Sequence, residues 1–185
     1  MRSRMKGIIP AVGGLSLLFA LPVGAVEVTF SGTLHDAPCQ IAGDGALMVE
    51  FPDTSLKNFQ YFPGRGGTKG FTITLEKCNT MTLQKTVKLA FTGNREDNME
   101  GQADYFLKVS GDNAGKLGIG ILDTDGATQM KLGDAHNHGQ GTGIDSKTLQ
   151  LNFKAFVQAT PGAIAQKSVQ AGTYESTANF NLTYE

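Results

Sequence analysis

Apolar and polar residues alternate without interruption from Val26 to Leu34. This period of two is typical of a β-strand, because successive side chains of a strand point to opposite faces. The apolar face would be formed by Val26, Val28, Phe30, Gly32 and Leu34. The pattern therefore predicts a strand suited to cover a hydrophobic groove, either in this chain or in a neighbouring one.

Shorter segments with the same alternation recur through the rest of the chain and end at glycine, asparagine or aspartate residues. A short run of alternating or β-branched residues bounded by such turn formers is typical of a strand. The predicted strands are residues 40–51 with a glycine-rich interruption, 71–75, 87–91, 105–109, 117–122, 149–157 and 178–184.

Two of the intervening segments are predicted to be loops. Residues 52–67 are rich in proline and glycine, and their aromatic side chains are expected to pack against the sheet. Pro161 and Gly162 favour a loop over a helical turn for residues 159–170. The aromatic residues in question are Phe59, Tyr61 and Phe62.

Seven or eight short strands without extended helical periodicity predict an all-β protein, a β-sandwich of immunoglobulin-like character. The composition agrees, because glycine is abundant, with 24 residues, and tryptophan is absent. The two cysteines, Cys39 and Cys78, predict one disulfide if the chain is exported.

The first 25 residues indicate export. Arg2, Arg4 and Lys6 precede an apolar run over residues 8–21, and small residues at 23–25 form a cleavage site, so residues 1–25 are interpreted as a signal peptide. Prolines and glycines in and beside the apolar run argue against a permanent membrane span.

Removal of this segment takes away three basic and no acidic residues and changes the formal charge from −1 to −4. An acidic domain has no electrostatic reason to bind nucleic acid. The remaining 160 residues suffice for one domain with a proper core.

Two groups of side chains were considered as metal ligands. The sequence Asp123-Thr124-Asp125-Gly126 begins like a calcium loop but lacks the later ligands, so it favours a hairpin turn. Asp134, His136 and His138 could approach one cation, but their glycine-rich surroundings favour surface histidines. No nucleophile elbow or free cysteine is present, so neither an enzyme nor a cofactor is expected.

Four stretches resemble the pilus subunits of the bacterial chaperone-usher pathway. They are VTFSGTLHDAPCQI, FTITLEKC, NAGKLGIGILDTDG and the ending GTYESTANFNLTYE. The penultimate Tyr184, and Gly172 fourteenth from the end, fit the terminal motif of that family. The stretches PGRGGTKGF, LGIGILDTDG and HNHGQG are similar to those of its adaptor-type minor subunits.

The resemblance implies an immunoglobulin-like sandwich that lacks its last strand and is completed by a donor strand from a partner. Residues 26–36 would be the donor extension, with Val28, Phe30 and Leu34 inserting and Gly32 at a small-residue position. Residues 37–185 would be the pilin domain, and the terminal carboxylate of Glu185 would anchor a periplasmic chaperone. The residues that would edge the groove and bind the chaperone are Gly172, Ala178, Phe180, Leu182, Tyr184 and Glu185.

The implied partners are that chaperone, an outer-membrane usher and neighbouring pilus subunits, and the implied location is a fimbrium on the bacterial surface. A repeating rod or tip-fibre subunit of the same family stays open as an alternative. A secreted carbohydrate-binding module that uses Tyr61 or Tyr105, or an adhesin, is a further alternative.

Overall fold

The structure is a computed structural model, and it describes residues 38–43, 45–81 and 85–185. All of them belong to the second of two compact units, which comprises residues 36–185. The predicted signal peptide and the predicted strand Val26–Leu34 lie outside the described residues.

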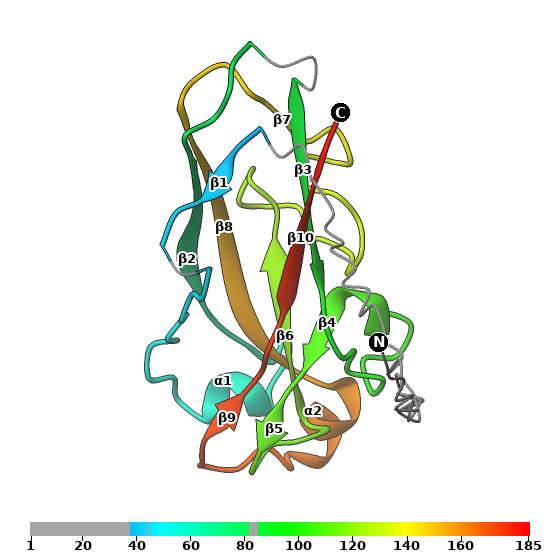
Figure 1. The fold of residues 1–185 in the computed structure, drawn as a ribbon. Coiled ribbons are helices and arrows are strands. Elements are labelled where there is room, and N and C mark those ends of the chain that lie inside the picture. Colours follow the sequence, from blue (N-terminus) through cyan, green and yellow to red (C-terminus); the bar gives the residue numbers. More distant parts are fainter. Residues whose placement is uncertain (1–37, 44, 82–84) are drawn as a thin grey trace, which may run out of the picture. The chain divides into compact units, whose positions relative to one another are not determined.

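The larger sheet has five strands in the order β1-β2-β8-β6-β4, and every neighbouring pair is antiparallel (Figure 1). Its centre is the long pair β2–β8, in which Phe71 lies opposite Phe153 and Ile73 opposite Leu151. The strands are β1 (Gln40–Ile41), β2 (Arg65–Glu76), β8 (Thr148–Ala159), β6 (Leu117–Leu122) and β4 (Phe106–Lys108).

The second sheet has three antiparallel strands in the order β10-β3-β7. They are β10 (Asn179–Tyr184), β3 (Thr86–Thr92) and β7 (Thr142–Gly143). A short separate pair joins β5 (Ser110–Gly111) to β9 (Tyr174–Glu175).

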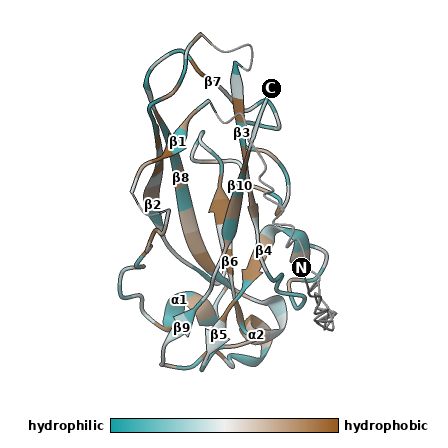
Figure 2. Cartoon of the chain, in the orientation of Figure 1, coloured by the Kyte–Doolittle hydropathy of each residue, from teal (hydrophilic) through white to brown (hydrophobic). Residues whose placement is uncertain are grey.

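The core lies between the two larger sheets. In β3 the side chains of Val87, Leu89 and Phe91 are buried, whereas their neighbours in the strand are half-buried. The ring of Phe91 meets that of Phe153 from the other sheet edge-on, at 5.1 Å between centroids. Figure 2 shows the hydrophobic colour on β6, which is buried along its whole length. The predicted all-β sandwich is therefore confirmed.

The first predicted core strand is only partly correct. Gln40–Ile41 forms β1, but residues 46–51 adopt no regular secondary structure, and Leu47 and Met48 are exposed. The alternating pattern there reflects a wall beside a groove, described below, and not a strand in the core.

The aromatic residues of the predicted 52–67 loop do not pack as a group. Phe59 is buried, in a short helix α1 (Lys57–Gln60), but the exposed fractions of Tyr61 and Phe62 are 58% and 91%. The expectation that all three cover the sheet is therefore wrong for Tyr61 and Phe62.

The expected loop at 159–170 contains a helix, α2 (Pro161–Gln166). Thr160 is its N-cap, and the hydroxyl oxygen of Thr160 accepts a hydrogen bond from the N–H of Ala163 at 3.2 Å. Proline is well tolerated in the first helical turn, so the pair Thr160-Pro161 is a start signal that outweighs the glycine. A 3₁₀ turn, η1 (Ala103–Tyr105), precedes β4. No helix in the described part of the chain is long and apolar enough to span a membrane.

Candidate functional site

One edge of β10 faces no described strand. Glu185 and Thr86 exchange two backbone hydrogen bonds, each 2.9 Å long, so they form a hydrogen-bonded pair of the antiparallel ladder. Because such pairs alternate, the N–H and C=O groups of Phe180, Leu182 and Tyr184 point away from β3. Within the described residues, β10 pairs with β3 alone.

On the opposite edge of the same sheet, the backbone groups of β3 are hydrogen-bonded to other parts of the chain. Beyond β3, the N–H of Leu89 donates to Nδ1 of His136 at 2.9 Å, and the N–H of His136 donates to the Leu89 carbonyl at 2.8 Å. Gly133 donates to the carbonyl of Phe91 at 2.8 Å, and β7 pairs with Val87. This edge is covered by a loop and a short strand, and a covered edge cannot recruit another strand.

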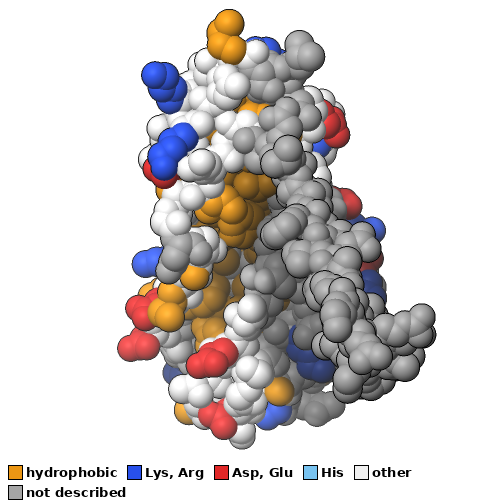
Figure 3. Space-filling view, in the orientation of Figure 1, with side chains coloured by type: hydrophobic (Ala, Val, Ile, Leu, Met, Phe, Trp, Pro, Cys, Tyr) orange, Lys and Arg blue, Asp and Glu red, His pale blue; other side chains and the backbone are white. Residues whose placement is uncertain are grey.

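A groove of about 440 Å³ opens beside the start of β10. Its floor consists of core side chains from both sheets, and Figure 3 shows hydrophobic side chains gathered in this hollow. One wall is formed by residues 176–180 and the other by residues from 45 to 51. The floor residues are Phe71, Ile73, Phe91, Leu107, Ile119, Ile121 and Ala155.

The groove has the chemistry of a binding surface for an apolar chain segment. No ionisable side chain occurs among the described residues that line it. A strand laid along β10 would pair with its outward backbone groups and place every second side chain over the apolar floor.

The predicted groove residues fall into three places. Ala178 and Phe180 line the groove. Leu182 and Tyr184 lie further along β10, half-buried against the core. Gly172 is elsewhere, in the turn before β9, where a Cβ atom would overlap the carboxylate of Asp112. The predicted donor residues, from Val26 to Leu34, lie outside the described part of the chain.

The end of β10 is fixed by two polar contacts. The hydroxyl of Tyr184 donates to the carbonyl of Cys39 at 3.4 Å, and burial raises the pKa of that phenol. The side-chain carboxylate of Glu185 pairs with Lys88 of the neighbouring strand at 2.8 Å.

The predicted disulfide between Cys39 and Cys78 is confirmed. Cys39 directly precedes β1, and Cys78 follows β2 by two residues. The disulfide therefore joins the start of β1 to the end of β2, next to the pair in which Gln40 lies opposite Glu76.

The sequence pattern did not predict that residues 45 to 51 form a wall of the groove. Its sequence alternates as a strand would, but the exposed fraction of Leu47 is 53% and that of Met48 is 83%. The only sequence signal for an open position is the pair of flanking glycines, Gly43 and Gly45, which adopt positive φ and interrupt the strand after β1.

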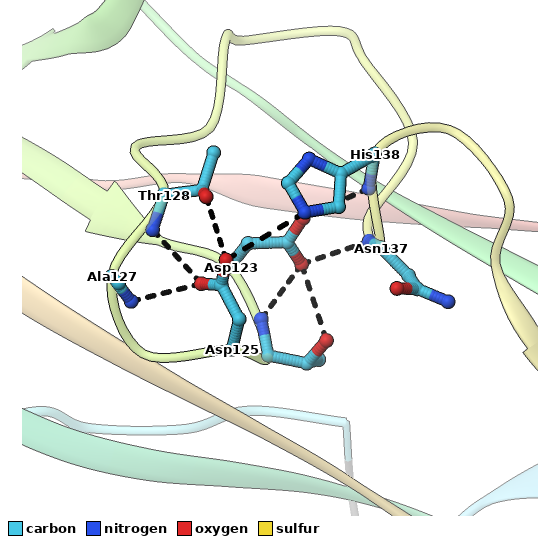
Figure 4. A network of polar contacts seen from close by, with 7 residues as sticks. Asp123, Asp125, Ala127, Thr128, Asn137 and His138 are labelled. Carbon is cyan, nitrogen blue, oxygen red and sulfur yellow. Dashed lines mark hydrogen bonds and ion pairs between the residues drawn. The ribbon is translucent and has the colours of Figure 1, made fainter.

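The Asp123–Asp125 segment is a turn held by its own carboxylates (Figure 4). Burial alone would raise the pKa of Asp123, but the backbone N–H groups of Asn137, Thr124 and His138 donate to its carboxylate and hold the pKa below its usual range. The hydroxyl of Thr128 and two backbone N–H groups lower the pKa of Asp125 to about 2. No cluster of three metal-ligating side chains occurs among the described residues.

The expectation of surface histidines is wrong for His136, which is fully buried, and correct for His138, which is exposed. Since Nδ1 of His136 accepts from Leu89, its ring hydrogen lies on Nε2 and is donated to the hydroxyl of Thr142 at 2.8 Å. The pattern gave no signal for this role, because the partner strand is 47 residues away.

Comparison with known proteins gives a consistent result. A family model described as fimbrial protein matches residues 28–185. The chain is 44% identical to the fimbrial adapter PapK of Escherichia coli over 181 residues, which cover 96% of this chain and 99% of PapK.

Two solved structures resemble the described fold. The P pilus rod subunit PapA superposes with a TM-score of 0.63 at 24% identity, covering 80% of this chain and 100% of that one. A subunit in a structure of a chaperone-usher pilus gives a TM-score of 0.63 at 25% identity, covering 89% of this chain and 98% of that one.

Proposed function

Since the chain belongs to the fimbrial protein family, we propose that its groove receives a β-strand from a neighbouring subunit, and that its own residues 26–36 fill the groove of another. The observation that carries this proposal is the outward edge of β10 beside an apolar groove. A strand added there satisfies the backbone groups of the edge and fills the apolar groove.

The protein is a structural, adaptor-type minor subunit of a pilus at the bacterial cell surface, and not an enzyme. Its partners are other pilus subunits. On the proposed function, residues 1–25 are removed on export, residues 26–36 are the donor extension and residues 37–185 are the pilin domain.

The energetics of such a joint are favourable. Burial of Val28, Phe30 and Leu34 contributes roughly 1.5 to 3 kcal/mol each, and several ladder hydrogen bonds add about 1 kcal/mol each. The sum is on the order of 10 kcal/mol before ordering of the extension is subtracted. A joint of this strength is long-lived.

An open groove also needs protection before assembly. A periplasmic chaperone that lends a strand to β10 would provide it, with the terminal carboxylate of Glu185 as its anchor, and an outer-membrane usher would exchange that strand for the donor extension. The position of Glu185, directly after the last strand and paired to Thr86, supports an anchor at this point.

The test exploits the small residue in the extension. Gly32→Leu is expected to abolish insertion into the preceding subunit, because the groove approaches the donor backbone closely there, while leaving chaperone binding through β10 intact. Ser31→Leu, on the polar face, is the matched control and should assemble. Pili counted by electron microscopy give the readout, and normal pili with Gly32→Leu would contradict the proposal.

The carbohydrate-binding alternative has less support. Tyr61 is exposed, but the Nζ atom of Lys167 lies 4.8 Å from its ring centroid and occupies one face of the ring. A sugar that stacks on this ring would have to use the other face.

A further inference from the structure

Tyr61 and Phe62, which we term the aromatic patch, follow helix α1 and are exposed although they are held in place. The N–H of Gly64 donates to the carbonyl of Tyr61 at 2.7 Å, and Phe59, two residues earlier, is buried. The ammonium of Lys167, just after α2, lies over the Tyr61 ring. Adjacent aromatic side chains that face solvent are typical of a protein–protein contact, where aromatic residues are enriched.

The patch lies at a defined end of the domain. Figure 1 draws α1, α2, β5 and β9 together at the end where β10 begins. Contacts connect this end to the groove, because the ring of Phe51, which lines the groove, lies 6.3 Å from that of Tyr174 in β9.

The direction of the inserted strand decides which end the donor subunit occupies. Every strand pair in the described sheets is antiparallel. A strand that continues this pattern beside β10 runs opposite to it, and so leaves the groove where β10 begins.

The donor subunit cannot lie far from that exit. In this chain four residues, 35–38, lie between Leu34, the last inserting side chain, and Cys39, so the tether is five residues long when Cys39 is included. Five residues span at most about 17 Å when fully extended. The folded domain of a donor with the same spacing must therefore sit against the end that carries α1 and α2.

Resting on the proposed function, we propose that the aromatic patch is a docking contact for the pilin domain of the subunit whose extension fills the groove. The extension supplies the strand, and the patch fixes the angle between successive domains by burying Tyr61 and Phe62. This contact is separate from the groove, because neither residue lines it.

The test uses assembled pili in which the photoreactive residue p-benzoylphenylalanine is placed at one position of this chain. Position 47 reports on the groove, because Leu47 lines it, and position 62 reports on the patch. Position 72 is the control, since Thr72 is an exposed residue of β2 hydrogen-bonded to Asn152 of β8. Position 61 replaces position 62 if pili do not assemble with the latter.

Mass spectrometry of the crosslinked peptides separates the outcomes. We expect position 47 to crosslink to the N-terminal extension of one subunit, and position 62 to crosslink to the folded domain of that same subunit, with a yield at least about tenfold above position 72. A crosslink at 47 with none at 62, or with a different protein or no protein at 62, overturns the docking contact and leaves the proposed function standing. Assembled pili without any crosslink from 47 to an extension overturn both.

Discussion

At the scale of single residues, His136 occupies a place that a strand would otherwise fill. Its ring accepts a hydrogen bond from the backbone N–H of Leu89, and its own backbone N–H donates to the Leu89 carbonyl, on the edge of β3 that faces away from β10. Burial lowers the pKa of this imidazole below its usual value, against the opposing field of Asp123. The ring is therefore neutral in the folded protein, and a proton on Nδ1 would break the bond from Leu89.

This geometry predicts a loss of stability in mild acid. Because the pKa of His136 is lower in the folded protein, the unfolded chain binds the proton first as the pH falls. The contribution of His136 to the free energy of unfolding is therefore complete above the unfolded pKa of about 6.5 and is lost as the pH falls below that value. Between pH 7.5 and 5.5 the loss cannot exceed about 1.4 kcal/mol per pH unit. His136→Asn, which keeps an acceptor near Leu89 but does not titrate, should flatten the profile. Urea unfolding at a series of pH values measures the stability of the parent chain and of the variant, each carrying the fused donor strand described below. Equal dependence of stability on pH in the two proteins would contradict the role assigned to His136.

Gly172 illustrates a second residue whose role is set by a neighbour. Its φ is +153°, and a Cβ atom would meet the Asp112 side chain. Gly172→Ala is therefore expected to lower the free energy of unfolding by about 1 to 3 kcal/mol. Gly162→Ala, in the first turn of α2 with open space around it, should be neutral or stabilising by up to about 1 kcal/mol. Thermal melts compare the two variants. Equal melting temperatures would show that the close contact with Asp112 is not the reason for glycine at position 172.

At the scale of elements, the two edges of the β10-β3-β7 sheet are unequal. The edge of β3 is closed by β7 and by the loop around His136, whereas the backbone N–H and C=O groups of Phe180, Leu182 and Tyr184 in β10 point away from β3. Alternate backbone groups of β10 therefore have different roles: one set pairs with β3, and the other set is where the proposed donor strand would bind.

Replacing single amides by esters in β10 separates these two sets. An ester at Leu182 removes an N–H that points away from β3, and is expected to weaken binding of a peptide with the sequence of residues 26–36 by about 1 kcal/mol, roughly fivefold in the dissociation constant. An ester at Asn181 removes an N–H of the ladder to β3, and should instead destabilise the domain by a similar amount. Titration with the peptide and thermal melts give the readouts, and the reverse result would show that the assigned register is shifted by one residue.

At the scale of the whole molecule, the floor of the groove is made of side chains that belong to the hydrophobic core. Ile73, Phe91 and Ile121 belong to the central core and also line this groove. Among the described residues, the outward edge of β10 lies unpaired beside this apolar groove, and such an edge is an aggregation hazard.

Fusing a donor strand after Glu185 should remove the hazard. The mature chain followed by a flexible linker and a copy of residues 26–36 is expected to be monomeric, with a melting temperature at least about 15 °C above that of the unfused chain. The same fusion with Phe30→Asp in the added copy is the control and should behave as the unfused chain. A stable monomeric unfused chain would contradict the proposed need for a donor.

Several strands could be predicted from local pattern alone. Alternation placed β2, β3, β8 and β10, because a period of two reports which face of a strand is buried whatever its partner. The disulfide followed from the presence of only two cysteines, and the family followed from short motifs.

The pairing of strand edges, in contrast, depends on contacts between distant parts of the chain. The segment 46–51 alternates like a strand yet forms a groove wall, and His136 has a polar, glycine-rich neighbourhood yet is fully buried. Both outcomes depend on partners far along the chain, Phe180 across the groove and Leu89 in β3. Periodicity records which face of a segment is apolar, but backbone hydrogen bonding along a strand edge leaves no trace in side-chain pattern. The edge of β10 that lies unpaired among the described residues was therefore implied only by the resemblance to pilus subunits, and its register and the groove beside it come from the tertiary structure.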